Sequence, residues 1–364
     1  VEFPENGYHG DDIKALAEEL VNLYGDTYLS VDPETRRNDM QIFGLKKNIE
    51  RMKKDLARYN LNYDCRFYES SLHDSGYVKE TIDMLDQLGV LYEKDGARWF
   101  KATAFGAEKD EVMVKSNGFY TYYAVDIAYH RNKFCERGFD EVIDALGADH
   151  HGHTIRFRAG ISALGIDPDR LKFILFQLVD LKQNGESVRM SKRTGKMISL
   201  SNLLDEISVD AARFFFNMRQ CGTHLEFDLD LAVRQDSDNP VYYVQYAHAR
   251  ICSLLKKLAE AGLSPASVEK LDLSLLTDPS ERLLIKQIAM LPEEIRLAAR
   301  DLEPYRMTKY LIDLATAFHS FYTEVNIKSA EPKVACARLT LADTTRAVLK
   351  NVLTLLKISA PEQM

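Results

Sequence analysis

The stretch EVIDALGADHHGHTIRFRAGISALGIDPDRLKFILFQLV, residues 141–179, decides the fold class. The mainly apolar segment 141–146 is predicted to be a strand, a glycine turn follows, the spacing at 155–164 is helical, and a second predicted strand occupies 172–179. A strand, a crossover helix and another strand are typical of a βαβ unit, whose strands pair in parallel. Ligands of such sheets bind beyond the carboxyl ends of the strands. We therefore expect a ligand site just after residue 146.

The segments before and after the βαβ unit have different sequence patterns. Ahead of the βαβ unit the pattern predicts helices at 11–24, 79–88 and 120–135, a strand at 61–68 and short antiparallel strands within 89–114. Beyond residue 201 glycine becomes rare, and amphipathic helices are expected at 202–220, 240–262, 279–301, 304–324 and 335–357. The fold class is thus α/β with a parallel sheet, followed by an all-α helical bundle. The expected domains are 1–117, 118–200 and 201–364.

Composition restricts the class of protein. The chain has 364 residues, 46% of them hydrophobic and 28% charged, as expected of a folded protein of two or more units. No run approaches the roughly 18 apolar residues of a membrane helix, so we expect no membrane partner. Five scattered cysteines, none in a Cys-x-x-Cys pair, argue against a disulfide framework and favour the cytoplasm. A net charge of -8 gives no overall attraction to nucleic acid, so any RNA contact must use local cations.

A basic loop follows the last strand of this region. Glu186-Ser-Val-Arg-Met-Ser-Lys-Arg-Thr-Gly-Lys196 concentrates cations, hydroxyls and a glycine, which are groups that handle phosphate. The bland interpretation is a solvated basic turn, and short motifs often match by chance.

The turn Gly147-Ala-Asp-His-His-Gly-His153 closes one predicted strand and opens a helix. Glycine there admits close approach of a ligand, and an aspartate can accept hydrogen bonds from ribose hydroxyls. Histidines with a purely structural role are one alternative, and metal binding is another, since this turn carries one aspartate and three histidines. However, adjacent residues on one short turn rarely converge on one ion, so we expect no metal site.

Two acids sit among apolar and aromatic residues. Glu69 lies in Phe-Tyr-Glu-Ser, and Asp126 lies one helical turn after Tyr122. A carboxylate in such a setting is stabilised by a cation, and a guanidinium can form two parallel hydrogen bonds to it in one plane. The alternatives are a helix amino-terminal carboxylate for Glu69 and, for Asp126, a salt bridge to Arg131 or Lys133.

The predicted helices beyond residue 201 interleave aromatic residues with cations, a pattern that can stack RNA bases and neutralise phosphates. Core tyrosines with solvated arginines are the alternative. The residues with this pattern are Tyr242, Tyr243, Tyr246, His248, Arg250, Arg300, Tyr305, Arg306 and Lys309.

Several of these motifs, in this order and spacing, resemble the bacterial arginyl-tRNA synthetases. Val188-Arg-Met-Ser-Lys192 is similar to the Lys-Met-Ser-Lys-Ser motif of class I aminoacyl-tRNA synthetases, with arginine at the first lysine and at the final serine. The likeness continues through Gly118-Phe-Tyr-Thr-Tyr122 and Asn239-Pro-Val-Tyr-Tyr-Val-Gln-Tyr246 to Ala360-Pro-Glu-Gln-Met364. His150-His-Gly-His153 mimics the His-Ile-Gly-His motif of this class but lies too close to Lys192, so we expect that motif to be absent and sequence to be missing in front.

The resemblance implies a role for each matching residue. Lys192 is the expected catalytic residue, stabilising charge on the ATP phosphates. The implied ATP-binding residues are Gly147, Asp149, His153, Val188, Met190, Ser191 and Lys192. The implied arginine-binding residues are Glu69, Tyr122, Asp126 and His150. The implied tRNA-binding residues are Tyr243, Tyr246, Arg250 and Met364.

The expected function is that of an arginine–tRNA ligase. It would join L-arginine to its tRNA, with ATP and Mg²⁺ as substrate and counter-ion and no tightly bound cofactor, as a cytoplasmic monomer. On its own the chain is expected to bind tRNA weakly and not to activate arginine. The alternatives are a synthetase-like tRNA-binding protein without catalysis and a metal-dependent hydrolase centred on Asp149.

Overall fold

A computed structural model of the chain describes residues 10–188, 199–267, 269 and 271–364. The chain divides into two compact units. The first comprises Val1–Asn62, Val179–Gln220 and Leu225–Met364, and the second comprises Tyr63–Leu178 and Cys221–His224. Each unit has hydrophobic clusters of its own.

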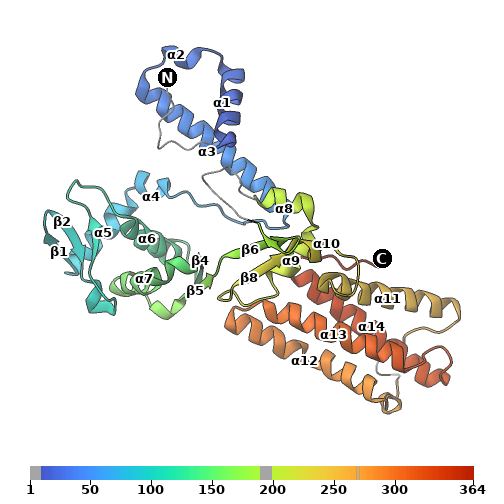
Figure 1. The fold of residues 1–364 in the computed structure, drawn as a ribbon. Coiled ribbons are helices and arrows are strands. Elements are labelled where there is room, and N and C mark those ends of the chain that lie inside the picture. Colours follow the sequence, from blue (N-terminus) through green and yellow to red (C-terminus); the bar gives the residue numbers. More distant parts are fainter. Residues whose placement is uncertain (1–9, 189–198, 268, 270) are drawn as a thin grey trace. The chain divides into compact units, whose positions relative to one another are not determined.

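The second unit contains the βαβ segment (Figure 1). Its helices are α4 (Ser70–Asp74), α5 (Tyr77–Gln87), α6 (Tyr122–Arg131), which continues as a π-helical turn (Asn132–Glu136), and α7 (His151–Ala163). Its strands are β1 (Leu91–Lys94), β2 (Ala97–Phe100), β3 (Glu111–Val114), β4 (Val142–Gly147) and β5 (Leu171–Phe176). Strands β1, β2 and β3 form an antiparallel sheet, whereas β4 and β5 pair in parallel from Val142↔Leu171 to Gly147↔Phe176. The predicted parallel pair is confirmed.

Helices α6 and α7 approach closely at Gly160. An ideal Cβ at this position would lie 2.1 Å from Ile127 Cδ1 and 3.1 Å from the Tyr123 hydroxyl. Both neighbours are on α6, and Ile127 is fully buried. Only glycine lets the two backbones pack at this distance.

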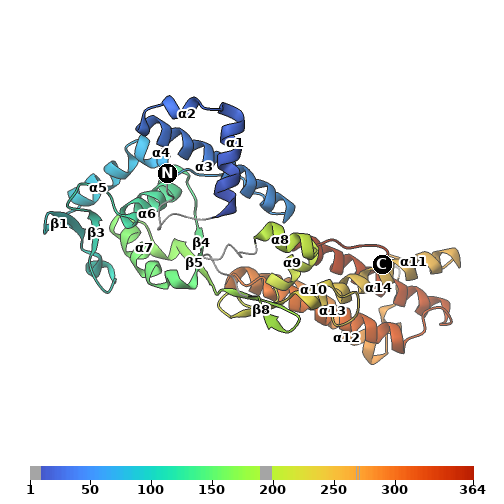
Figure 2. The same cartoon turned by 45° about the horizontal axis from the view of Figure 1, so that its top comes forward.

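The first unit is mainly helical (Figures 1 and 2). Its elements are α1 (Asp11–Tyr24), α2 (Thr27–Ser30), α3 (Pro33–Arg58), β6 (Val179–Gln183), β7 (Glu186–Ser187), α8 (Leu200–Glu206), α9 (Val209–Phe216), β8 (Leu225–Asp228), α10 (Leu229–Val233), α11 (Pro240–Glu260), α12 (Pro279–Asp301), α13 (Tyr305–Glu324) and α14 (Pro332–Leu355). The four long helices α11 to α14 run side by side in both views and pack on one another. Strand β6 pairs with β7 antiparallel and with β8 parallel. The predicted helical bundle is therefore confirmed.

A capping residue followed by proline marks the amino end of four helices in this unit. Helices α3, α11, α12 and α14 each have proline at the first helical position, which needs no N–H there. The preceding residue is Asp32, Asn239, Asp278 or Glu331, and its side chain accepts hydrogen bonds from free backbone N–H groups of the first turn. At α12, Asp278 and Glu281 form a reciprocal capping box.

Some predicted elements are wrong. Residues 61–68 form no strand, because no neighbouring segment supplies ladder partners in the described structure; Phe67 instead stacks on Tyr129 at 4.7 Å. The single helix expected at 202–220 is two helices, since Ser208 begins a new helix by capping Ala211 N–H. The strand expected at 172–179 ends at Phe176, and β6 begins a separate sheet.

No helix in the described ranges is both long enough and apolar enough to cross a membrane.

Candidate functional site

The turn after β4 lies at the carboxyl end of the parallel pair. Gly147 ends β4, a single 3-10 turn (Ala148–His150) follows, and α7 begins at His151. A Cβ at Gly147 would lie 2.6 Å from Asp149 Oδ1, so glycine is needed for this carboxylate to fold back toward the strand end. Asp149 stays 83% exposed in its side chain and is free to receive a ligand. The predicted strand–turn–helix setting is confirmed, whereas the ribose contact itself stays a prediction.

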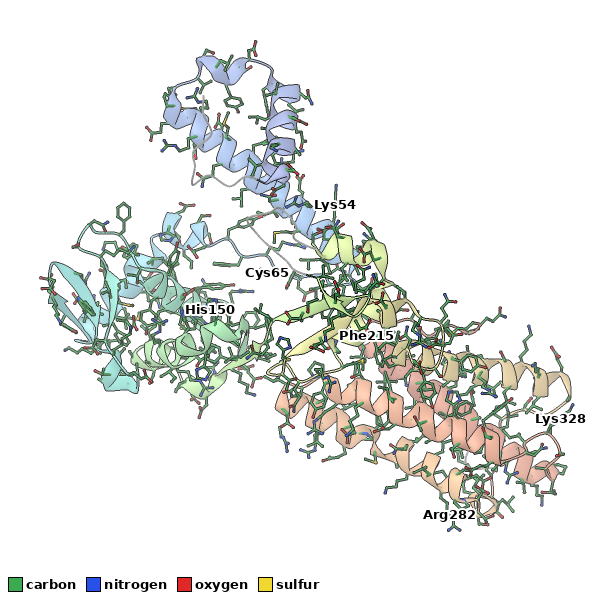
Figure 3. All side chains as sticks on the ribbon, in the orientation of Figure 1. Lys54, Cys65, His150, Phe215, Arg282 and Lys328 are labelled. Atoms are coloured by element: carbon green, nitrogen blue, oxygen red, sulfur yellow. The ribbon has the colours of Figure 1, made fainter. Side chains whose placement is uncertain are left out.

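Two histidines of the turn lie beside this carboxylate. His150, labelled in Figure 3, has Nε2 3.8 Å from Asp149 Oδ2, and its ring centre is 5.0 Å from that of His153. Burial, together with Arg156 and His150, lowers the pKa of His153, so its ring is neutral at pH 7. Among the described residues no group of three potential ligands could hold a metal ion, and the hydrolase alternative has no observation in its favour.

Asp126, on α6, is one of the two predicted arginine-binding acids. Its carboxylate is half-buried and, within the described residues, has no hydrogen bond or ion pair. Burial raises its pKa, and the charges of Glu69 and Asp144 raise it further against the opposing effect of His130. A half-buried, unpaired carboxylate with a second acid nearby is an environment that a cation would stabilise.

The salt-bridge alternative for Asp126 is wrong. Arg131 binds Glu80 at 2.7 Å, and Lys133 binds Asp144 at 2.7 Å. The two cations near Asp126 in sequence therefore serve other carboxylates, because α6 directs them to α5 and β4.

Glu69 and Tyr122 are more exposed than their neighbours. Glu69 occupies the position just before α4, makes no cap hydrogen bond, and has a 61% exposed side chain with His73 Nε2 4.0 Å away. Tyr122 opens α6 after the capping residue Thr121 and is 85% exposed. The charge of Glu69 contributes to raising the pKa of Asp126, helix α4 packs on α6, and Tyr122 shares the helix of Asp126.

Sequence reasoning did not find the polar network behind Asp126. His130 is 3% exposed, with Nδ1 2.7 Å from the Asp126 carbonyl oxygen and Nε2 2.6 Å from Asp144 Oδ2. Both partners are acceptors, so both ring nitrogens must donate and the ring carries a positive charge. Burial alone would raise the pKa of Asp144, but hydrogen bonds and charges from His130 and Lys133 lower it to about 2. The network holds the α6 turn of Asp126 against β4.

The residues of the basic loop cannot be placed. Met190, Ser191 and Lys192 fall within 189–198, outside the described residues. Val188 is described: its N–H donates to the Leu181 carbonyl at 2.8 Å, and its side chain packs against the core of the first unit.

The helical unit brings the predicted RNA-binding tyrosines together. Tyr243 and Tyr246 on α11 line a cavity of about 440 Å³ with Ser237, Tyr242, Arg250 and His319. The Arg250 guanidinium lies 4.1 Å from the Tyr322 ring centre and 5.7 Å from that of Tyr246, so the cation is held over aromatic faces.

His319 on α13 completes this cavity and was not predicted. Its ring centre is 4.8 Å from that of Tyr243, and its Nε2 is buried without a partner in the described structure. Burial and the charge of Arg250 lower its pKa. The signal in the sequence was a histidine next to Phe318 on a helix that otherwise supplies many buried apolar residues.

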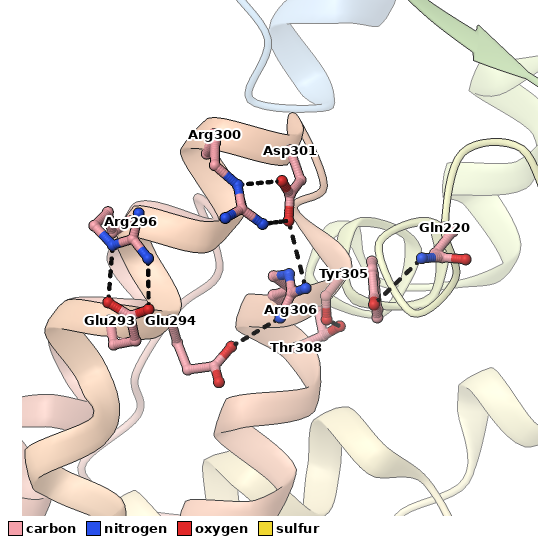
Figure 4. A network of polar contacts seen from close by, with 9 residues as sticks. All are labelled: Gln220, Glu293, Glu294, Arg296, Arg300, Asp301, Tyr305, Arg306 and Thr308. Atoms are coloured by element: carbon pink, nitrogen blue, oxygen red, sulfur yellow. Dashed lines mark hydrogen bonds and ion pairs between the residues drawn. The ribbon is translucent and has the colours of Figure 1, made fainter.

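Two of the three later cations of the pattern, Arg300 and Arg306, are paired with acids (Figure 4). Arg300 donates to Asp301 at 2.6 Å, and Arg306 lies 3.5 Å from Glu294 and 3.4 Å from Asp301. The bland interpretation therefore suits the α12–α13 turn better than RNA contact does.

Met364 lies apart from the tyrosine cavity but close to α11. It lines a second cavity, of about 480 Å³, with Tyr242, Asn239 and Gln245 among others. Because Tyr242 borders both cavities, the two form adjoining hollows along the start of α11.

Comparison with known proteins agrees with these features. Residues 21–220 match the family model described as "tRNA synthetases class I (R), catalytic domain", which is more than half of the chain. The chain belongs to this family. Residues 244–364 match the "DALR anticodon binding domain".

Similar proteins carry one name. The chain is 53% identical over 364 residues to an arginine–tRNA ligase of Acetivibrio thermocellus, covering 100% of this chain and 64% of the relative. It is 54% identical over 363 residues to an arginine–tRNA ligase of Caldanaerobacter subterraneus, covering 100% and 65%. This class I (R) chain thus spans about two thirds of the relatives' length.

A solved structure shares the fold of this synthetase chain. It is that of a proposed arginyl-tRNA synthetase from Campylobacter jejuni, with a TM-score of 0.89 and 32% identity, covering 100% of this chain and 78% of that one.

Proposed function

We propose that this chain supplies the arginine-binding and tRNA-binding parts of an arginine–tRNA ligase. The observation that carries the proposal is the half-buried carboxylate of Asp126, which forms no ion pair among the described residues and whose pKa is raised by burial and by the charge of Glu69. A guanidinium would neutralise this site by charge-assisted hydrogen bonds to both acids. The relatives named arginine–tRNA ligase support the same substrate.

The proposed reaction has two steps. The carboxylate of L-arginine attacks the α-phosphorus of ATP, giving arginyl-adenylate and pyrophosphate. A hydroxyl of the terminal tRNA ribose then attacks the arginyl carbonyl and releases AMP. Magnesium enters with ATP as part of that substrate.

The chain's residues would act mainly by positioning. Glu69, Tyr122 and Asp126 would hold the arginine side chain, while His150 would lie near its amino and carboxyl groups. Gly147, Asp149 and His153, at the strand end, would bind the ATP ribose side together with Val188 and the residues outside the described ranges, Met190 and Ser191. Lys192, also outside those ranges, would stabilise phosphate charge.

The helical unit would recognise the tRNA. Tyr243 and Tyr246 line a cavity in which unstacked bases could pack against aromatic rings, and Arg250 supplies a local cation in a chain of net charge -8. Met364 would add an apolar contact from the second cavity. We further propose that the protein acts as a monomer in the cytoplasm.

The test is aminoacylation of total tRNA with each amino acid in turn. The protein would be this chain joined to the remaining third of the A. thermocellus relative, and arginine alone should be charged. Charging of another amino acid would contradict the substrate assignment, and no charging at all would favour the non-catalytic tRNA-binding alternative. The 364-residue chain by itself should show no arginine-dependent ATP–pyrophosphate exchange.

A further inference from the structure

The last residues of the chain are fastened to two helices by a set of polar contacts. The Arg213 side chain donates to the Leu356 carbonyl at 2.7 Å, and Ile358 is 2% exposed. Asp210, on α9, accepts from the Ser359 N–H at 3.0 Å and also from the Ser359 hydroxyl. Chain termini normally fray unless specific groups hold them, so these contacts need an explanation.

Two buried side chains on α11 continue the attachment. Gln245 is 8% exposed, and its Nε2 donates to the Ser359 carbonyl at 2.9 Å and to Asp210 Oδ2 at 2.8 Å. His248 is fully buried, and its Nδ1 lies 2.8 Å from the Pro361 carbonyl oxygen, to which it must donate. The tail is thus held at residues 359 and 361, and the nearer contact lies three residues before Met364.

The attachment leaves one buried polar atom unsatisfied among the described residues, which indicates that His248 has a role beyond packing. Once His248 donates through Nδ1, its buried Nε2 is left without a partner in the described structure. An apolar residue at this position would avoid that unsatisfied group. Gln245 also lines the cavity that Met364 lines, so the attachment and the cavity share a wall.

We propose that Asp210, Gln245 and His248 are positioning residues that fasten residues 359–364 to α9 and α11, so that Met364 forms a fixed wall of an RNA-binding cavity. The RNA-binding part rests on the function proposed above. The tail is therefore a built element of the binding surface, preorganised before RNA arrives.

Near-isosteric changes test the attachment without removing volume. Gln245→Glu replaces the donor by an acceptor facing the Asp210 carboxylate and the Ser359 carbonyl. His248→Leu removes the donor to Pro361, whereas His248→Asn keeps an N–H near the position of Nδ1 and should rescue it. Ile251→Val is the control, because Ile251 is fully buried on the same helix and takes no part in these bonds.

Two measurements on the 364-residue chain separate the parts of the inference. The first is the rate at which a carboxypeptidase releases Met364 in the absence of RNA. The second is the Kd for a transcript of arginine-accepting tRNA, with a second tRNA species for comparison. Gln245→Glu and His248→Leu should each raise the release rate and the Kd by about tenfold. His248→Asn and Ile251→Val should change neither by more than about twofold.

The outcomes are distinct. Unchanged release from Gln245→Glu and His248→Leu would overturn the attachment itself. Faster release with an unchanged Kd would overturn the role of the tail in RNA binding while leaving the proposed function intact. A parent chain with no preference for the arginine tRNA would overturn the proposed tRNA recognition, and the role in RNA binding would fall with it.

Discussion

At the scale of single residues, two aspartates of the second unit, Asp126 and Asp144, differ in their surroundings. Asp144 on β4 pairs with both His130 and Lys133, whereas Asp126 on α6 forms no ion pair among the described residues. Their pKa values accordingly move in opposite directions. Asp144 is a structural anion, and Asp126 is left available for a ligand.

Replacing Asp126 by asparagine should weaken arginine binding by about 10- to 100-fold, because a charge-assisted bond to the guanidinium is lost. In the parent chain, affinity should fall as the pH drops through the raised pKa of Asp126, since the protonated acid no longer attracts a cation. Asp126→Asn should remove that pH dependence. Calorimetric titration with arginine at several pH values measures both effects.

Asp83→Asn is the matched control for this experiment. Asp83 is an aspartate of the same unit that pairs with Lys79 on the surface of α5, so arginine affinity should not change. Equal affinities of the Asp126 variant and the parent would remove Asp126 from the arginine site.

Because of Asp144, the free energy of unfolding should decrease at acidic pH. Its pKa lies below the ordinary value of 3.8, at about 2, so its contribution is complete above pH 3.8 and is lost as the pH falls toward 2. The difference corresponds to about 2 kcal/mol. Asp144→Asn should lower the unfolding free energy at pH 7 by about 3 kcal/mol, because it leaves Lys133 and His130 buried without their anion.

Urea unfolding at pH 7 and at pH 3 tests this. The parent should lose more stability than Asp144→Asn between the two values. Identical losses in the two proteins would show that Asp144 does not carry the ionic contribution.

Some of these site residues could be predicted from the sequence, and others could not. Glu69 and Asp126 were identifiable because each is an acid among apolar neighbours. The link from His130 to Asp144 joins a helix to a strand, and neither spacing nor composition reveals such a contact. The alternative that paired Asp126 with Arg131 or Lys133 fails for the same reason, since the partner of Lys133 is selected by the packing of α6 on β4.

At the scale of helices and strands, prediction succeeded where a stripe of apolar residues meets a core. Helices α11 to α14 have such stripes and were anticipated closely. Helix α3 was not anticipated, and none of its 26 residues is buried. Strand β8 was missed because it has four residues and takes its place through pairing with β6. Short or exposed elements depend on partners that a local pattern does not show.

Gly160→Ala should destabilise the second unit by about 1–3 kcal/mol, because the added methyl group would overlap Ile127 on α6. Gly152→Ala, in the same helix, meets nothing within 4 Å and should be neutral or slightly stabilising, by up to about 1 kcal/mol. Denaturant unfolding followed by the fluorescence of Trp99, in the same unit, measures both. A stable Gly160→Ala protein would mean that α6 and α7 can separate without cost.

At the scale of the whole molecule, the chain has two sets of hydrophobic clusters that share no buried residue. The three predicted domains, 1–117, 118–200 and 201–364, remain a prediction, because the two compact units are defined by contacts and not by function. The first unit gathers segments from three parts of the chain, and such an arrangement is invisible to a reading that moves along the sequence.

We expect the two units to unfold in separable transitions. Phe318→Leu lies in the cluster of the first unit and Phe100→Leu in that of the second; both side chains are fully buried. Each change should cost about 1–3 kcal/mol and lower one transition only. Scanning calorimetry with limited proteolysis would assign the transitions, and a single transition shifted equally by both variants would contradict this expectation.

Because residue 160 has no side chain, the substitutions that positions 127 and 160 can accept depend on each other. While isoleucine occupies position 127, any side chain at 160 collides with it; once position 127 becomes valine or alanine, the vacated space can accept a methyl group from α7. The order of substitution then matters, because the first change must shrink the α6 residue before the α7 residue can grow. Divergence at these sites should therefore be paired and directional, and a lineage that has made both changes cannot readily restore isoleucine at 127 before glycine returns at 160.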